Sequence, residues 1–89
     1  MVERVIMIQN RLGLHARAAA MFVQTASKYA SEVTMEKDGV EVNGKSIMGL
    51  MMLAAAKGSD VTIRAKGSDE AEAVAGIEDL IRQKFHEEA

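Results

Sequence analysis

The chain of 89 residues contains no cysteine, proline or tryptophan, and only 3% of it is aromatic. Without cysteine it can form neither a disulfide nor a thiolate metal site, which leaves its redox compartment open. No apolar run approaches the roughly 18 residues that a membrane span needs, and no signal-peptide pattern opens the sequence. A formal net charge of −2 excludes the strongly basic surface of a nucleic-acid binder. We therefore expect a cytoplasmic protein without membrane insertion or a nucleic-acid partner.

The residues that are present suffice for one hydrophobic core, because 48% of the chain is hydrophobic. A chain of this length suits a single small domain, which we expect to span residues 1–89. Such a core is marginal in size, so most apolar positions must face one interior.

Hydrophobic periodicity predicts seven elements in the order βαββαβα. The strands are expected at residues 2–8, 32–36, 40–43 and 60–66. The helices are expected at residues 16–30, 47–56 and from about Asp69 to Phe85. An Asp-Gly turn at residues 38–39 joins the second and third strands as a hairpin. The order predicts an α+β fold in which the helices cover one face of a four-stranded sheet.

The side-chain pattern makes further predictions within these elements. The first strand is nearly continuously apolar, which predicts partial burial on both of its faces. Asp69 and Glu72 have the spacing of a capping box, and residues 87–89 are expected to fray. The buried stripe of the first helix is expected to comprise Ala19, Phe22, Val23, Ala26 and Ala30. That of the last helix is expected to comprise Val74, Ile77, Leu80, Ile81 and Phe85.

His15 is the residue that the local sequence singles out for chemistry. It follows a turn at Gly13 and precedes a helix whose first five residues are four alanines and Arg17. Backbone N–H groups, the positive end of a helix dipole and a guanidinium therefore converge beside one imidazole, which favours an anion such as phosphate. A lone turn histidine without chemistry is the alternative. No metal site is expected, because the only other histidine is His86.

The segment after Ser46 carries a second candidate site. Ser46 precedes a helical run and is predicted to be its N-cap, where an added phosphate would be tolerated. The helix is too apolar for one buried face. Leu50, Leu53 and Ala54 form a plausible inward stripe, which leaves Ile47, Met48 and Met51 for an exposed docking patch. A fully buried helix is the alternative.

Two motifs resemble one known family over the whole chain. The segment Leu12-Gly13-Leu14-His15-Ala16-Arg17-Ala18-Ala19 resembles the active-site signature of the HPr family, the histidine-containing phosphocarriers of the bacterial phosphoenolpyruvate-dependent phosphotransferase system. The segment Asn43-Gly44-Lys45-Ser46-Ile47-Met48-Gly49 resembles the regulatory-serine segment of that family. The resemblance implies an open-faced β-sandwich with a four-stranded antiparallel sheet.

The resemblance also implies a function. His15 would accept a phosphoryl group on Nδ1 from phosphorylated Enzyme I and pass it to an EIIA-type acceptor, with no cofactor. Arg17 and the N–H groups of Ala16 and Arg17 would hold the phosphoryl oxygens. The chain would be a monomeric relay rather than an enzyme, and an HPr kinase/phosphorylase would modify Ser46. Partners would dock on Ala16, Ala20, Ile47, Met48 and Met51.

The chain departs from the family pattern at several positions. Ala18 stands where most members have proline, and Gln24, Ser27 and Gly49 stand where many sugar-system members are basic. The run His15-Ala16-Arg17-Ala18-Ala19 and the segment Leu53-Ala54-Ala55-Ala56-Lys57-Gly58 are similar to the nitrogen-related branch, so a regulatory carrier not coupled to sugar uptake is the alternative function. From other classes, a ferredoxin-like ligand-binding or metal-chaperone domain would need a ligand cluster that this chain lacks. A structural module that uses only the methionine surface would need no chemistry at His15.

Overall fold

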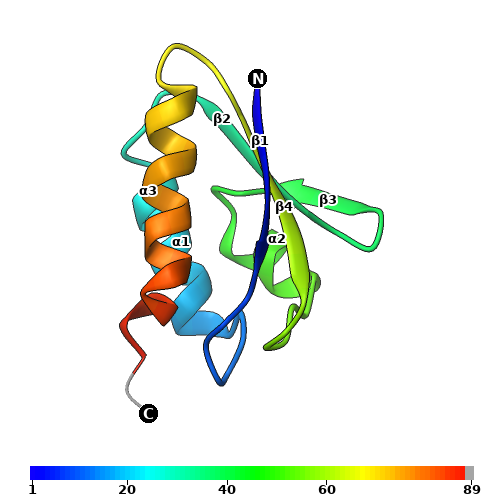
Figure 1. Ribbon diagram of the computed structural model, residues 1–89. Helices are drawn as coiled ribbons and strands as arrows, with labels where there is room; N and C mark the ends of the chain where they lie inside the picture. The colour runs from blue at the N-terminus through cyan, green and yellow to red at the C-terminus, as the bar shows by residue number, and fades with distance from the viewer. Residues whose placement is uncertain (88–89) are drawn as a thin grey trace.

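The fold, a computed structural model that describes residues 1–87, has a helical layer on one side of an antiparallel sheet (Figure 1). The four strands are β1 (Val2–Met7), β2 (Glu32–Lys37), β3 (Val40–Asn43) and β4 (Asp60–Lys66). The helices are α1 (Ala16–Ala26), α2 (Ile47–Met52) and α3 (Glu70–Arg82), followed by the short turn η1 (Lys84–His86). The sheet order is β1-β4-β2-β3 with every pair antiparallel, so the predicted α+β architecture is confirmed.

The strands alternate between a buried and an open face. In β4, Val61, Ile63 and Ala65 are buried, whereas Thr62 and Arg64 lie on the other face. The expectation that β1 is partly buried on both faces is wrong: Ile6 is buried, but Val5 and Met7 on the other face are 66% and 48% exposed. Because the helices cover only one face of the sheet, the apolar side chains on the other face of β1 remain exposed.

The buried faces of the helices and the sheet form one core. Its largest fully buried side chains include Phe22, Met35, Leu50, Ile63 and Ile77. The predicted stripe of the last helix is buried throughout, including Phe85. No helix within residues 1–87 is long and apolar enough to cross a membrane.

The first helix is shorter than predicted, and Ala30 is exposed rather than buried. The carboxylate of Asp69 accepts hydrogen bonds from the N–H groups of Ala30 and Ser31, at 2.9 and 3.0 Å, and from the Ser31 hydroxyl. These backbone donors are therefore held outside a helix. The hydrogen bond from Ser31 lowers the pKa of Asp69 below its ordinary value, together with the backbone donors.

The same contact overturns the predicted capping box. Asp69 is the N-cap residue of α3, but its side chain makes no cap hydrogen bond because it faces the α1–β2 connection. The carboxylate of Glu70 instead accepts a hydrogen bond from the N–H of Gly67. The spacing of acids was typical of a capping box, but a tertiary partner 39 residues away competes for the carboxylate.

The second helix ends at Met52, four residues before the predicted end. Ala54 adopts a positive φ of 49° and is exposed, contrary to its predicted inward position, whereas Leu50 and Leu53 are buried as predicted. This left-handed residue turns the chain so that Ala55 faces the interior in its place. The Ala55 carbonyl thereby becomes available to the loop that precedes His15.

The C-terminal segment does not fray at Glu87, whose carboxylate accepts a hydrogen bond from the N–H of Leu12. Residues 88–89 of the predicted frayed end lie outside the described part of the chain. Three consecutive residues, Lys84, Phe85 and His86, have φ values of 57°, 54° and 56°. Such left-handed conformations cost about 1–2 kcal/mol per residue, so burial of Phe85 must hold the turn in place.

Candidate functional site

His15 is the N-cap residue of α1. Its backbone is extended, with φ −76° and ψ 177°, and its carbonyl accepts the first helical hydrogen bond from Ala19 at 2.8 Å. The imidazole makes no cap hydrogen bond. The N–H groups of the first helical turn, which begins at Ala16, have no carbonyl partner within the helix. The half-exposed imidazole therefore lies beside free backbone donors at the positive end of the α1 dipole.

The loop before His15 is held from two sides. Gly13 has a φ of 67°, and a β-carbon there would lie 2.5 Å from the carbonyl oxygen of Ala55. That same oxygen accepts a hydrogen bond from the N–H of Leu14 at 2.8 Å. The loop after α2 thus packs directly on the backbone of the His15 loop, and only glycine fits at the point of contact.

Asn10 supports the loop from the interior, a role that the sequence did not predict. It is fully buried, and its Nδ2 donates to the carbonyl oxygen of Gly13 at 2.7 Å. The N–H of His15 donates to the same oxygen at 2.9 Å. A polar residue at the start of a turn was the available signal, because asparagine commonly bonds the backbone of the turn that follows it.

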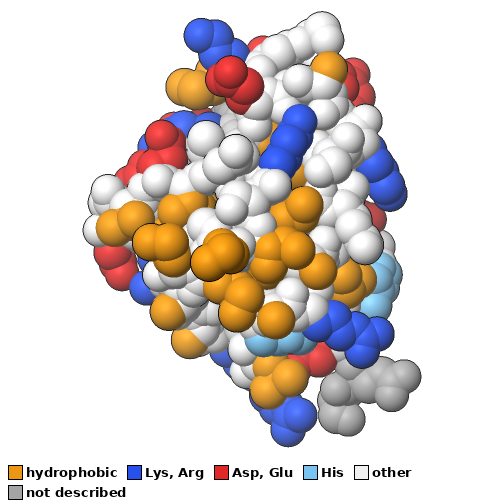
Figure 2. All heavy atoms as spheres, turned by 180° about the vertical axis from the view of Figure 1, so that it is seen from behind, with side chains coloured by type: hydrophobic (Ala, Val, Ile, Leu, Met, Phe, Trp, Pro, Cys, Tyr) orange, Lys and Arg blue, Asp and Glu red, His pale blue; other side chains and the backbone are white. Residues whose placement is uncertain are grey.

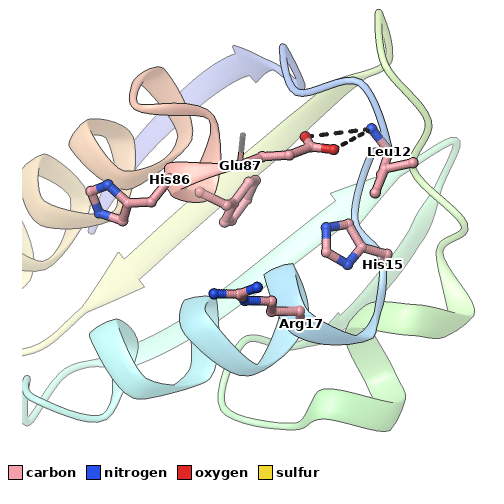
Figure 3. Close-up of a pocket in the computed structure, with 6 residues that line it drawn as sticks. Leu12, His15, Arg17, His86 and Glu87 are labelled. Atoms are coloured by element: carbon pink, nitrogen blue, oxygen red, sulfur yellow. Dashed lines mark hydrogen bonds between the residues drawn. The ribbon is translucent and has the colours of Figure 1, made fainter. Parts of the chain in front are cut away.

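A hollow of about 500 Å³ lies beside the imidazole. Its lining residues are Leu12, His15, Arg17, Phe85, His86 and Glu87. Figure 3 shows His15 and Arg17 entering from the start of α1 and Glu87 reaching Leu12 from the C-terminal turn, whereas the His86 ring points away from His15. Arg17 is exposed.

The structure thus brings together His15 and Arg17, as predicted, and adds the C-terminal residues. Glu87 was expected to fray, and no local pattern in the sequence predicts a contact between residues 75 apart. Among residues 1–87, no three histidine, cysteine or acidic side chains form a group that could hold a metal ion. A guanidinium and the free backbone donors of α1 lie beside the same hollow, an arrangement that favours an anion.

Ser46 is the N-cap of α2, as predicted. Its Oγ accepts a hydrogen bond from the N–H of Gly49 at 3.1 Å, and its carbonyl accepts one from Leu50 at 3.0 Å. The side chain is half-buried. The neighbouring Lys45 ammonium donates to the Tyr29 carbonyl at 2.8 Å, which ties the start of α2 to the end of the α1 region.

The outer face of α2 is an exposed apolar surface, so the alternative of a fully buried helix is wrong. Hydrophobic side chains gather on this face of the molecule, beside a histidine (Figure 2). Met48 is 78% exposed, and Ile47 and Met51 are also exposed, as predicted. Met52, 77% exposed, was missed, although it lies four residues after Met48 and so on the same side of the helix. We call Ile47, Met48, Met51 and Met52 the methionine patch.

The two α1 residues expected at the docking surface also reach solvent. Ala16 is exposed and Ala20 is half-buried. Because α1 packs against α2, small side chains at the start of α1 extend the apolar surface toward His15.

Known proteins resemble this chain over nearly its whole length. Residues 2–83 match the family model described as PTS HPr component phosphorylation site. The phosphocarrier protein HPr of Neisseria meningitidis is 55% identical over 87 residues, covering 98% of this chain and 98% of that protein. The structure of HPr-C-His from Thermoanaerobacter tengcongensis is 53% identical, with a TM-score of 0.95 over 100% of both chains. A structure described as an HPr dimer from that organism is 53% identical, with a TM-score of 0.79 over 98% of this chain and 100% of that one.

Proposed function

The chain belongs to the HPr family of phosphotransferase-system phosphocarriers, and on that premise we propose that His15 is the residue that carries the phosphoryl group. The observation that carries this proposal is the position of His15 at the open N-terminus of α1, with Arg17 lining the same hollow. Family membership supports the relay role in general. The choice of residue rests on this geometry.

The proposed step is an in-line displacement at phosphorus. The lone pair on Nδ1 of His15 attacks the phosphorus atom, while the bond to the donor breaks and leaves its electron pair on the donor. The Arg17 guanidinium and the N–H groups of Ala16 and Arg17 face the phosphoryl oxygens and stabilise their negative charge. Transfer to the acceptor is the same displacement in reverse, so the chain is returned unchanged and acts as a relay rather than an enzyme.

The donor and acceptor are proposed to be phosphorylated Enzyme I and an EIIA-type protein. Both would dock on the apolar surface formed by the methionine patch together with Ala16 and Ala20. Methionine side chains are flexible and polarizable, which suits a surface that must fit two different partners in turn. The exposed position of Met48 next to the start of α2 supports this assignment.

Ser46 is proposed as a regulatory phosphorylation site for an HPr kinase/phosphorylase. A phosphate on its Oγ would lie at the N-terminus of α2, where negative charge is favourable, so the helix need not unfold. The same phosphate would add negative charge directly beside Ile47 and Met48. We therefore expect modification to alter docking rather than the fold.

The nitrogen-related, regulatory branch is the second candidate function. Gln24, Ser27 and Gly49 are uncharged at positions where basic residues would attract an acidic partner. Offering the phosphorylated chain separately to a sugar-type and a nitrogen-type EIIA domain distinguishes the branches. The faster acceptor identifies the branch.

The monomeric state expected from the sequence stays a prediction. Three solved structures of relatives are described as dimers, which concerns those proteins. Light scattering during size-exclusion chromatography measures the state of this chain directly, and a concentration-dependent dimer would contradict the expectation.

The central experiment is incubation with Enzyme I and phosphoenolpyruvate. The wild-type chain should gain one acid-labile phosphoryl group, and the His15→Ala variant should gain none. His86→Ala is the matched control, because His86 is the only other histidine, and it should be phosphorylated like the wild type. Phosphorylation that persists in His15→Ala would exclude the proposal.

The docking surface has its own test. Met48→Asp should slow phosphoryl transfer from Enzyme I about tenfold, because a charge in an apolar interface must be desolvated. Val5→Asp, at a similarly exposed apolar residue on the open face of the sheet, should transfer at the wild-type rate. Equal rates for the two variants would remove the methionine patch from the docking surface.

A further inference from the structure

The C-terminal turn brings a carboxylate to the His15 hollow. Glu87 Oε1 lies 3.1 Å from the backbone nitrogen of Leu12, and Oε2 lies 3.5 Å from it. Leu12 belongs to the loop that places His15, since Gly13 follows it directly and the Gly13 carbonyl accepts a hydrogen bond from the N–H of His15. The contact therefore joins the end of the described chain to the loop that holds the imidazole (Figure 3).

The turn delivers Glu87 to this position at a conformational cost. Three consecutive left-handed residues reverse the chain after α3, and Phe85 anchors the turn with 3% of its surface exposed. The ring of His86 points away from His15, so Glu87 is the charged group that this turn directs at the site (Figure 3). Among the six residues that line the hollow, Glu87 is also the one acid.

A carboxylate beside a phosphoryl acceptor has a predictable electrostatic effect. A phosphoryl group on His15 would bring nearly two negative charges into the hollow, where like charges repel. Arg17, on the same hollow, acts in the opposite direction by attracting those charges. A relay must both accept and release its phosphoryl group, and a negative charge opposite the guanidinium favours release.

We propose that Glu87 is a positioning residue. Its carboxylate, which accepts a hydrogen bond from the Leu12 amide, shifts the phosphorylation equilibrium of His15 toward the free chain. The inference rests on the proposed function of His15. It has a second consequence, because a phosphoryl group on His15 repels the carboxylate and loosens its hydrogen bond to Leu12. The Leu12 N–H should therefore exchange with solvent faster in the phosphorylated chain than in the free chain.

The test is a competition between two chains for a limited supply of phosphoryl groups. Isotope-labelled wild type and the unlabelled Glu87→Gln variant are mixed in equal amounts with catalytic Enzyme I and substoichiometric phosphoenolpyruvate. Each exchange breaks one bond between nitrogen and phosphorus and forms another, so the mixture reaches an equilibrium that consumes nothing else. Intact mass spectrometry at neutral pH then gives the phosphorylated fraction of each chain.

The variant is chosen to separate charge from structure. Glutamine keeps an oxygen that can accept from the Leu12 amide but removes the negative charge. We expect Glu87→Gln to show a ratio of phosphorylated to free chain about fivefold above that of the wild type. Glu32→Gln, an exposed acid that follows the opposite end of α1, is the control and should share the phosphoryl groups equally with the wild type.

The outcomes distinguish this inference from the function on which it rests. A wild type that takes up no phosphoryl group overturns both. A phosphorylated wild type that shares equally with Glu87→Gln overturns the role of Glu87 alone, even if Glu87→Ala lowers stability by loss of the hydrogen bond from Leu12. Faster Leu12 exchange on phosphorylation of the wild type but not of Glu87→Gln supports it, because a purely structural contact would not respond to charge on His15.

Discussion

The N-termini of α1 and α2 begin with residues in the same extended region of backbone conformation but use them differently. At α2, the Ser46 hydroxyl accepts the N–H of Gly49 and so caps its own helix. At α1, His15 makes no side-chain cap, and the first-turn donors stay available. A capped terminus is complete without a ligand, whereas an uncapped one keeps its affinity for an anion.

The support under the two termini differs as well. The Ser46 terminus is satisfied locally, by residues within four positions of the serine. The His15 terminus depends on Asn10, in its own turn, and also on Ala55 and Glu87, which come from two distant parts of the chain. A site that must place an imidazole accurately therefore uses tertiary contacts, and the difference between the termini can be tested by exchanging their features.

The largest effect is expected from making α1 resemble α2. His15→Ser removes the phosphoryl acceptor, so uptake of acid-labile phosphate should be abolished. The serine hydroxyl can cap the free donors, so the free energy of unfolding should rise by about 1 kcal/mol. Urea unfolding monitored by circular dichroism measures the second effect.

His15→Ala is the matched control for this exchange, because it removes the imidazole without adding a cap. It should lose phosphorylation equally but gain no stability. Equal stability of the serine and alanine variants would show that the α1 donors are not available for capping.

Gly13→Ala should damage the His15 terminus next most severely. The variant needs an unfavourable positive φ and places a β-carbon against the Ala55 carbonyl, so we expect about 3 kcal/mol of destabilisation. Displacement of the loop should also slow phosphorylation about tenfold. Gly39→Ala is the control: it has a φ of 82° but no atom within 4 Å, so only the backbone cost of about 1 kcal/mol remains. Similar losses at both glycines would argue against the role of the Ala55 contact.

These contacts explain what the sequence could and could not predict. The order of elements, the faces of β4 and α3 and the Ser46 cap follow from patterns within a few residues, and all are confirmed. Ala30, Ala54 and the capping box at Asp69 were wrong because a distant partner or a left-handed residue redirected the chain. The location of His15 could be predicted, but its support by Ala55 and Glu87 depends on packing between distant segments.

A smaller effect is expected at the α2 terminus. Ser46→Ala removes the acceptor of the Gly49 N–H and should lower the free energy of unfolding by about 1 kcal/mol. Phosphorylation of His15 should continue at the wild-type rate if the two termini are independent. Ser46→Asp keeps a capping oxygen and should retain the stability that alanine loses. A loss of stability in both variants would show that the hydroxyl itself is required.

The smallest effect concerns the N-terminus of α3, where Asp69 directs its carboxylate to another loop rather than to its own helix. The hydrogen bond from Ser31 and those from the backbone lower the pKa of Asp69 in the folded chain, below an ordinary value of 3.8. The unfolded chain therefore binds this proton more readily, so the stabilising effect is complete above that value and is lost as the pH falls through the lowered pKa. In Asp69→Asn this part of the acid dependence should disappear, as measured by urea unfolding between neutral pH and pH about 3. Glu72→Gln, an exposed acid in the same helical turn, is the control and should keep the wild-type acid dependence. If Asp69→Asn also keeps the wild-type acid dependence, then the Asp69 carboxylate does not join α3 to the end of the α1 region as its hydrogen bonds indicate. The N-terminus of α3 would then resemble that of α1, whose N-cap side chain makes no hydrogen bond.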